Sequence, residues 1–337
     1  MASLKDIAEK TGLSINTVSR ALRGRGYVSA EAQNKVRAAA DELGYAPNRA
    51  ARSLRFNRNF EIAVLVFIDR LNARGDSLTM DKLIGIKKQI ASSGYEVNLQ
   101  FIYHESRYGT ESKNQLEPIL RQKPAGVIMI GDAPQQLEMT TECLRKGIPA
   151  VIMSYSELKD FNCVYIDRSQ GIRDSVNYLY GMGRRNIVYA QLNPCKNRLR
   201  GYREGIKRNH LPEYIIAPEK FYDLNDDLFA VGVSLAERIL NEVPGTDAIQ
   251  AYSDYLAAGL LAGLIRRGKR VPEDISLVGF DNRELSAFTS PPLTTLAQPG
   301  FKAGKLTVEL LLEQIESGVQ TLKAVKVPMS LIIRKST

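Results

Sequence analysis

The stretch GLSINTVSRALRGRGYVS, residues 12–29, contains one short helix whose outer face has an unusual composition. Within it, Val18, Ala21 and Leu22 recur at helical spacing and predict the inner side. The outer side combines an exposed apolar residue at the first turn with an amide, a hydroxyl and two guanidinium groups: Ile15, Asn16, Ser19, Arg20 and Arg23. A helix face that meets only water usually mixes acidic and basic side chains, whereas this face has no acid. We therefore expect it to contact a partner.

The residues around this helix predict two further short helices. Ser3 and Asp6 have the spacing of a capping box, and Gly12 fits the left-handed end of a first helix. Ser14 begins the second helix only two residues later, and Ser29 begins a third. Three short helices with a tight, glycine-containing turn between the first two predict a helix-turn-helix.

The bases of duplex DNA suit the outer face of the second helix. In a helix-turn-helix, the second helix enters the major groove and its early residues reach the base edges. Asparagine suits adenine, arginine suits guanine and an aliphatic side chain suits the thymine methyl group, which fits Asn16, Arg20 and Ile15. The residues alone leave a second interpretation open, namely a solvated basic face on a three-helix interaction domain.

The positive charge of the chain is concentrated near its N-terminus. The 337 residues carry a formal net charge of +9, of which +6 falls within residues 1–60. A basic module on a nearly neutral body indicates a polyanionic partner for that module alone. The length exceeds what one hydrophobic core normally holds, so two or three domains are expected.

The N-terminal residues resemble a known family. LKDIAEKTGLSINTVSRAL (residues 4–22) and VSAEAQNKVRAAADELGYAPNRAARSL (residues 28–54) are similar to the N-terminal module of the LacI/GalR family of bacterial transcription regulators. The resemblance implies that three residues read bases: Ile15, Asn16 and Arg20. It implies contacts to the DNA backbone for four more: Ser14, Thr17, Ser19 and Asn48.

The segment PNRAARSLRFNRN, residues 47–59, predicts a short hinge helix. Pro47 ends what precedes it, and Asn48 can cap about two helical turns. A helix this short is marginal in water, and its arginines, including Arg52, repel one another, so we expect it to fold on DNA. Leu54 then acts as an apolar wedge at a minor-groove step. The alternative, that Leu54 packs on the next domain, is disfavoured by the family resemblance.

From residue 60 onward, short apolar runs alternate with helical stretches. Runs such as EIAVLVF (61–67) and ISLVGF (275–280) are typical of buried strands. Their alternation with helices predicts parallel sheets, and two such series predict two doubly wound halves. The expected organisation is a helix-turn-helix domain at 1–46, a hinge helix and linker at 47–60, and an effector-binding and dimerisation domain at 61–337. We expect a first half of about 61–160 with 292–320, and a second half of about 161–291 with 321–337.

This body resembles the periplasmic-binding-protein-like effector domain of the same family. The resemblance depends on RGYREGI (200–206), ISLVGFDNREL (275–285) and PPLTTLAQP (291–299). It implies an α/β body of two doubly wound parallel-sheet subdomains behind the all-α N-terminal domain. Three departures leave the identity of the ligand open. The usual Gly-His is Gly183-Arg184, a second Asp is replaced by Asn282, and the loop after the first strand lacks aromatic residues.

Candidate effector-binding residues follow the carboxyl ends of the predicted strands. Ligands of open α/β sheets bind there, which with two halves means the cleft between them. Five residues meet this rule: Asp69, Ser154, Tyr155, Arg198 and Asp254. Separately, Tyr222, with Phe221, can stack on a ring of the ligand. An arginine and a carboxylate across a cleft can bind vicinal hydroxyls or a carboxylate group, and the resemblance assigns ligand contacts to Arg198 and Asp254. Helix capping or a surface ion pair is the alternative role for these charged residues.

The sequence gives no sign of catalysis or of a metal. It contains no GxxxxGK[ST], no GxSxG and no GxGxxG between a strand and a helix. Two histidines and three widely spaced cysteines without a CxxC pair predict neither a disulfide framework nor a metal site. We expect no enzyme activity, no metal and no cofactor.

Together these features predict a transcriptional repressor controlled by a small molecule. One helix-turn-helix reads only a few base pairs, so we expect a homodimer on a pseudopalindromic operator. The resemblance implies a carbohydrate effector. A nucleobase or a sugar phosphate stays possible as the effector, as do a stand-alone sugar-binding protein and a sugar-processing enzyme as the class of protein. Residues 1–10 lack an apolar segment, and no run approaches 18 apolar residues. We therefore expect a cytoplasmic, nucleoid-associated protein that does not contact the membrane.

Overall fold

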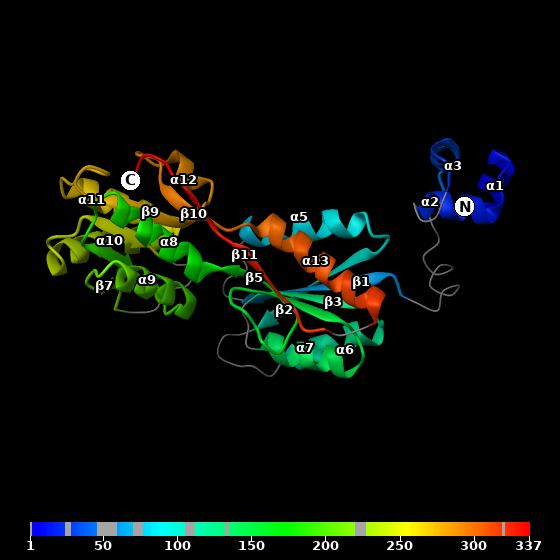
Figure 1. Ribbon diagram of the computed structural model, residues 1–337, viewed down its shortest axis with the longest axis horizontal. Coiled ribbons are helices and arrows are strands. Elements are labelled where there is room, and N and C mark those ends of the chain that lie inside the picture. Colours follow the sequence, from blue (N-terminus) through cyan, green and yellow to red (C-terminus); the bar gives the residue numbers. More distant parts are fainter. Residues whose placement is uncertain are drawn as a thin grey trace. The chain divides into compact units, whose positions relative to one another are not determined.

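Three short helices form the N-terminal part of the chain: α1 (Leu4–Thr11), α2 (Ile15–Arg23) and α3 (Ala30–Glu42) (Figure 1). Small aliphatic residues from all three helices form the core, with Ile7, Val18 and Val36 fully buried. Alanines at the other inward positions allow the helices to approach closely. This is the predicted helix-turn-helix.

The computed structural model describes residues 2–23, 28–45, 59–69, 77–104, 112–131, 135–219, 227–318 and 321–337. It divides into two units, of which the first contains residues 1–60 with 94–96 and the second contains the remainder. No helix among the described residues is long and apolar enough to cross a membrane.

Local hydrogen bonds set the ends of the first helices. Ser3 Oγ accepts from the Asp6 amide at 3.3 Å, and the Asp6 carboxylate accepts from the Ser3 amide at 2.7 Å, which completes the predicted capping box. The serine also donates to that carboxylate, and these bonds lower the pKa of Asp6 below its ordinary value. Gly12 ends α1 at φ 70°, a left-handed conformation that glycine adopts without strain.

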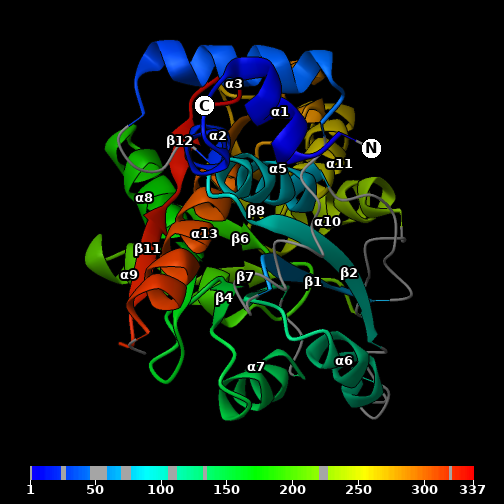
Figure 2. The ribbon, with the colours of Figure 1, turned by 90° about the vertical axis from the view of Figure 1, so that its right-hand side faces the viewer.

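The first sheet of the body has the strand order β11-β5-β4-β3-β1-β2. Its strands are β1 (Glu61–Asp69), β2 (Glu96–His104), β3 (Gly126–Ile130), β4 (Ala150–Ser154), β5 (Cys163–Asp167) and β11 (Ala324–Pro328). The described pairings from β1 through β3, β4 and β5 to β11 are parallel. Helices α5 (Ser77–Ala91) and α13 (Gly300–Ser317) cover one face, and α6 (Ser112–Arg121) and α7 (Gln135–Arg145) cover the other (Figures 1 and 2).

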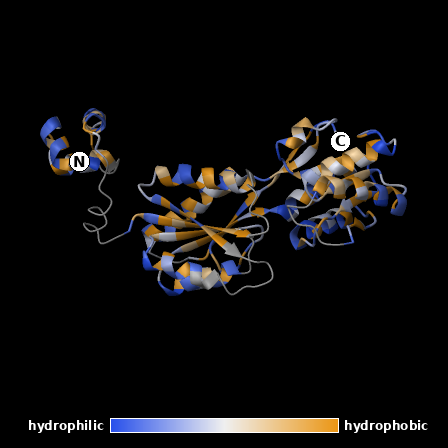
Figure 3. Cartoon of the chain, turned by 180° about the vertical axis from the view of Figure 1, so that it is seen from behind, coloured by the Kyte–Doolittle hydropathy of each residue, from blue (hydrophilic) through white to orange (hydrophobic). Residues whose placement is uncertain are grey.

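The second sheet has the strand order β12-β10-β9-β8-β6-β7. Its strands are β6 (Ile187–Ala190), β7 (Tyr214–Ile216), β8 (Ala248–Ala251), β9 (Ser276–Asp281), β10 (Thr294–Ala297) and β12 (Ser330–Ile332), and only the β10–β12 pairing among the described strands is antiparallel. Helices α8 (Arg168–Gly181) and α9 (Lys196–Arg208) pack together, as do α10 (Leu228–Glu242) and α11 (Asp254–Arg266), and a single turn, α12 (Leu285–Phe288), follows β9. In the first sheet, hydrophobic strands are visible between helices that carry hydrophilic residues, as a sheet covered on both sides requires (Figure 3).

The chain passes between the two sheets three times, and these crossings correct the predicted boundaries. β5 and β11 lie in the first sheet, although they were predicted in the second half, and β10 lies in the second sheet although it was predicted in the first. The predicted final strand is two strands, because β11 pairs with β5 and β12 pairs with β10. Apolar periodicity identified the strands, whereas the sheet that each strand joins depends on partners far away in the sequence.

Candidate functional site

Helix α2 has one buried side and one exposed side. Val18 and Ala21 are fully buried, whereas Ile15 is 46% exposed and Asn16 and Arg20 are exposed. Arg20 makes no ion pair or hydrogen bond with another described residue, so its guanidinium group is available to a partner. The amide, the guanidinium group and the aliphatic side chain therefore lie together near the N-terminal end of α2.

Two hydroxyl groups hold the start of α2. Ser14 Oγ accepts from the Thr17 amide at 3.1 Å, and the two side-chain hydroxyls lie 2.8 Å apart. The Ser14 carbonyl also accepts from the Val18 amide. Ser14 is exposed and Thr17 is half-buried, which leaves hydroxyl groups at a helix N-terminus, a usual place for a phosphate.

Of the other predicted DNA contacts, the structure describes the side chain of Ser19. Ser19 was predicted on the outer face of α2, but it is 7% exposed. The structure corrects that prediction, because the position lies at the edge of the face that packs on the other two helices. The side chain of Arg23 lies outside the described residues, as do Asn48, Arg52 and Leu54.

In the body, Arg198 is brought to the carboxyl ends of the strands of the second sheet. It was predicted on a turn and lies in the first turn of α9, 5% exposed. Its Nη1 donates to the carbonyl of Tyr252, just after β8, and its guanidinium carbon lies 4.0 Å from the centroid of the Phe280 ring in β9. Aromatic rings thus hold a buried cation in place.

Tyr155, just after β4, is surrounded by cations from different elements. The Nζ of Lys82 in α5 donates to Tyr155 Oη at 2.8 Å, and the guanidinium carbon of Arg168 lies 3.2 Å from the ring centroid. Its carbonyl accepts from Asn197 Nδ2 in α9 at 3.2 Å. Tyr155 therefore contacts a helix of the first sheet, α5, and a helix of the second sheet, α9. Neither Lys82 nor Arg168 was predicted, although the position of Arg168 directly after a strand was a usable signal.

Asp281 at the end of β9 is a third residue of this region that was not predicted from the sequence. It is 7% exposed, its Oδ1 accepts from Gln298 Nε2 at 2.5 Å, and its Oδ2 lies 3.8 Å from Arg283 Nε. Arg168 Nη2 donates to the same Gln298 side chain at 3.4 Å. Asp281 has φ 108°, a strained backbone for a non-glycine residue that is typical of ligand sites. The quoted GFDNREL motif contains this aspartate at a strand end, which was the available signal.

Asp254, by contrast, faces the protein interior. It is fully buried as the first residue of α11, its Oδ1 accepts from Thr295 Oγ1 at 2.6 Å, and its Oδ2 accepts from the Arg283 amide at 2.6 Å. Burial raises its pKa to about 7. Both carboxylate oxygens are engaged internally, so the structure corrects the prediction of an effector contact. The side chain of Asp69 and all of Tyr222 lie outside the described residues.

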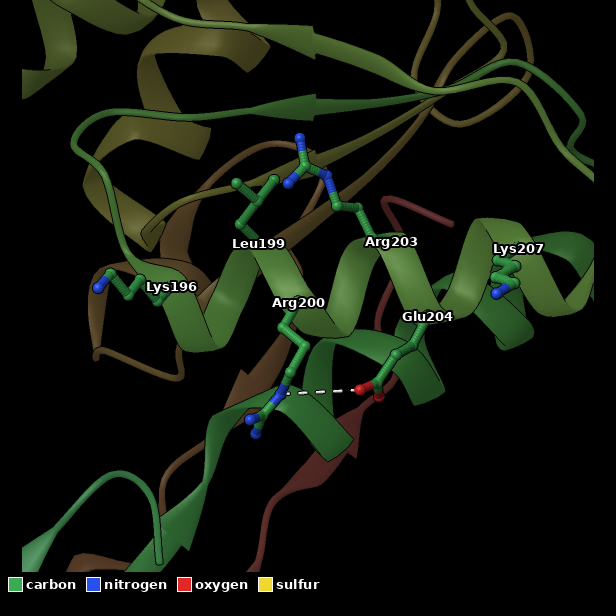
Figure 4. Close-up of a pocket in the computed structure, with 6 residues that line it drawn as sticks. All are labelled: Lys196, Leu199, Arg200, Arg203, Glu204 and Lys207. Carbon is green, nitrogen blue, oxygen red and sulfur yellow. Dashed lines mark ion pairs between the residues drawn. The ribbon is translucent and has the colours of Figure 1, made fainter.

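A surface pocket lies along α9 (Figure 4). It is lined by four basic residues with Leu199 and Glu204, and the Arg200 Nε lies 3.6 Å from a carboxylate oxygen of Glu204. Arg203 is paired with Glu213 at 2.9 Å. These side chains are largely paired and solvated, and none was predicted as a ligand contact. We assign no effector role to this pocket.

Comparisons with known proteins agree with this architecture. Residues 3–48 match the family described as bacterial regulatory proteins, lacI family, and residues 176–337 match the periplasmic binding protein-like domain. The HTH-type transcriptional repressor CytR of Escherichia coli (strain K12) is 30% identical over 346 residues, covering 100% of this chain and 96% of CytR. The repressor PurR of Vibrio vulnificus (strain CMCP6) is 30% identical over 349 residues, covering 99% and 98%. A solved lac repressor dimer bound to operator and the anti-inducer ONPF is 27% identical, with a TM-score of 0.73 over 99% of this chain and 98% of that one.

A helix-turn-helix with an exposed reading helix, followed by a body of two doubly wound sheets, defines an effector-controlled DNA-binding regulator of transcription. The chain belongs to the lacI family of bacterial regulatory proteins. The named relatives are transcriptional repressors rather than enzymes.

Proposed function

We propose that the protein is a repressor that binds a pseudopalindromic operator as a homodimer and changes its operator affinity when a carbohydrate binds the body. The observation that carries the proposal is the exposed group of Ile15, Asn16 and Arg20 on a helix with a buried opposite side. These side chains have the chemistry that reads thymine, adenine and guanine in the major groove. Because an operator is part of the bacterial chromosome, we propose that the protein acts in the cytoplasm.

Selection of bound duplexes from a random pool tests operator reading. We expect an inverted repeat to be enriched, with half-sites separated by about one helical turn. Asn16→Ala should relax the preference at one base pair of each half-site without unfolding the domain. Enrichment of no sequence at all would contradict the proposal.

The hinge segment supplies the other DNA contacts of the proposal. We propose that Asn48 and Arg52 contact the DNA backbone and that Leu54 enters a minor-groove step. Leu54→Ala should then weaken binding to the selected operator more than binding to random duplexes. Arg52→Ala should weaken both alike and reduce the salt dependence. Equal effects of the two substitutions on every duplex would contradict the wedge role.

The homodimer is proposed through the edge of the first sheet. Val97, Leu99 and Phe101 alternate along β2 and are 37–46% exposed, while Ile102 points into the core beside α6. The three exposed residues therefore lie on the face that α5 covers, where Met80 and Ile84 of α5 are also exposed. An apolar surface of this kind on an edge strand marks an interface. The similar lac repressor binds its operator as a dimer, which supports the same assembly here.

The effector site is proposed around Arg198, Tyr155 and Asp281. A buried guanidinium group and a buried carboxylate at the carboxyl ends of strands suit the paired hydroxyls of a sugar. Thermal-shift measurements against sugars, sugar phosphates and nucleobases test this, because a tight ligand raises Tm by mass action. Asp281→Asn should abolish the shift that a bound sugar produces while operator binding without ligand is kept. Turnover of the bound sugar would instead identify an enzyme.

A further inference from the structure

We propose that the effector carries an anionic group, a carboxylate or a phosphate, which binds Lys82 and Arg168 beside Tyr155. This inference rests on the proposed function, since it names the chemical class of ligand for the same effector site. The ligand is then a sugar acid or a sugar phosphate rather than a neutral sugar. The inference is based on two cationic side chains, Lys82 of α5 and Arg168 of α8.

Lys82 is a buried ammonium group. Its side chain lies in α5 and is 3% exposed, and its one described hydrogen bond goes to the neutral phenol of Tyr155. An ammonium group has three protons to donate. No carboxylate among the described residues lies within 4.0 Å of it.

Arg168 contacts the ring of the same tyrosine. Its guanidinium carbon is 3.2 Å from the Tyr155 ring centroid, and Lys82 Nζ is 5.0 Å from that centroid. The two charges are therefore no more than 8.2 Å apart, the sum of these distances. Its Nη2 donates to Gln298, whereas its Nε is buried and has no partner in the part of the chain that the structure describes.

The neighbouring carboxylates are engaged with other groups. Asp167 Oδ2 lies 2.6 Å from Lys326 Nζ, and Asp167 Oδ1 accepts from the Gln170 amide at the start of α8. Asp281 accepts from Gln298 and lies close to Arg283. Within the described residues, Lys82 and Arg168 therefore keep an excess of positive charge at this position.

A buried cation without a counterion is unfavourable, since it has lost the hydration that stabilised its charge. An anion that receives charge-assisted hydrogen bonds from both side chains offsets this cost, and a guanidinium group matches a carboxylate or a phosphate well. Two unpartnered polar atoms that suit hydroxyl groups lie at the carboxyl end of β6. Tyr189 Oη and Gln191 Oε1 are buried without hydrogen-bond partners in the described chain. Burial raises the pKa of the Tyr189 phenol, which keeps it neutral and able to donate a hydrogen bond.

Inorganic phosphate at constant ionic strength is the first probe. In the full-length protein we expect phosphate to raise Tm saturably, as a bound ligand does. Arg168→Met and Lys82→Met should each weaken phosphate binding by about tenfold or more, the loss expected for a charge-assisted hydrogen bond. Lys207→Met is the matched control, since Lys207 is exposed on α9 away from these residues, and it should keep the wild-type response.

The same variants separate a ligand site from a structural role. Without phosphate, Lys82→Met should have a Tm equal to or above that of the wild type, because it removes a buried charge that no described carboxylate pairs. Arg168→Met, at a half-buried position, should have a Tm close to that of the wild type. A structural role would lower Tm in both. Absence of phosphate stabilisation in the wild type, or equal stabilisation of all four proteins, would overturn the proposal.

Matched organic ligands then identify the source of the anion. Glucuronate and glucose 6-phosphate are compared with glucose, and we expect one of the two anions to bind at least about tenfold more tightly than glucose. The preferred one decides between carboxylate and phosphate. Binding of glucose as tight as that of both anions would overturn the proposal. Operator selection is a separate readout, so a failed anion test leaves the repressor function intact, and a failed operator test is recognised independently.

Discussion

Arg20 is the residue on α2 for which the physical expectation is most specific. It is exposed and free of described ion pairs, and its guanidinium group can make a bidentate contact with guanine. Arg20→Ala should cost about 1–3 kcal/mol of binding free energy on the selected operator and relax the preference at one base pair per half-site. Arg37 is exposed on α3, so Arg37→Ala serves as the control for loss of charge alone. Titration of labelled duplexes measures both, and an unchanged base preference in Arg20→Ala would remove the assignment of α2 as the reading helix.

Asp254 leads to a prediction about pH. Burial raises its pKa from 3.8 to about 7, with a smaller contribution from the nearby Asp281. Because the pKa in the folded state is above that in the unfolded state, the stabilisation is complete below about pH 4 and is lost as pH rises through about 7. Between about pH 5 and about pH 8 the wild type should lose about 3 kcal/mol of unfolding free energy that Asp254→Asn does not lose. Urea unfolding of both proteins at the two pH values measures this difference, and parallel pH profiles would show that Asp254 stays ionised when buried.

The contrast between Asp254 and Asp281 shows what sequence could not decide. Both aspartates follow a buried strand of the second sheet, so the rule of carboxyl strand ends treats them alike. In the structure, Thr295 of β10 and the Arg283 amide reach Asp254, which turns it into an internal acceptor. Those partners are 29 and 41 positions away in the sequence. Ser19 is a similar case, since its burial depends on how α2 packs on the other helices rather than on its place within α2.

At the scale of elements, the close packing of α10 on α11 depends on two glycines. A Cβ atom added at Gly259 would lie 2.1 Å from the Phe229 carbonyl oxygen and 2.9 Å from Gly232 Cα. Backbone atoms cannot rotate away, so Gly259→Ala should destabilise the body by about 1–3 kcal/mol.

Gly181 provides the matched control for that prediction. It lies in the last turn of α8, and a Cβ added there would meet nothing within 4 Å. Gly181→Ala should therefore stabilise the protein by about 0.5–1 kcal/mol, because alanine loses less conformational freedom in a helix. Denaturant titration of the two variants should give opposite signs. A Gly259→Ala protein as stable as the wild type would mean that the two helices are further apart than described.

The elements themselves were largely predictable, and the connections between sheets were not. Short β-branched runs separated by amphipathic stretches indicated the strands and helices of both halves, because that alternation follows from burial on both faces. The run VKVPMSLII illustrates the limit. Pro328 ends β11, and Met329 packs against Gly171 of α8, where a Cβ would lie 2.9 Å from its sulfur, before β12 begins in the other sheet. Nothing in the local pattern distinguishes one long strand from two short strands in different sheets.

At the scale of the whole body, the three crossings lie beside the proposed effector site. Arg168 follows the first crossing strand and donates to Gln298, which precedes the second crossing into α13. In the third crossing, between β11 and β12, the Met329 amide donates to Gln170 Oε1 of α8. A ligand that binds Arg168 and Asp281 would act directly on the segments that join the two sheets. A ligand shifts a conformational equilibrium only through different affinities for its states, so such a ligand would act on the protein only where these segments are arranged differently in the two states.

Assembly is tested through the exposed face of β2. Phe101 is 46% exposed on an edge strand beside two other exposed apolar residues, so Phe101→Glu places a charge in the proposed interface while leaving the core intact. Leu322→Glu is the control, because Leu322 is 61% exposed outside that face. Sedimentation should show a monomer for Phe101→Glu and a dimer for the wild type and the control.

DNA binding then connects assembly to function. A monomer presents one reading helix, so about half of the phosphate contacts are lost and the slope of log affinity against log salt should fall to about half. Binding to the inverted repeat should become no tighter than binding to a single half-site, since one subunit no longer holds the other near the DNA. If the Phe101→Glu protein stays dimeric, this face is not the interface. A monomer that keeps the wild-type salt slope would show that operator reading does not need two subunits.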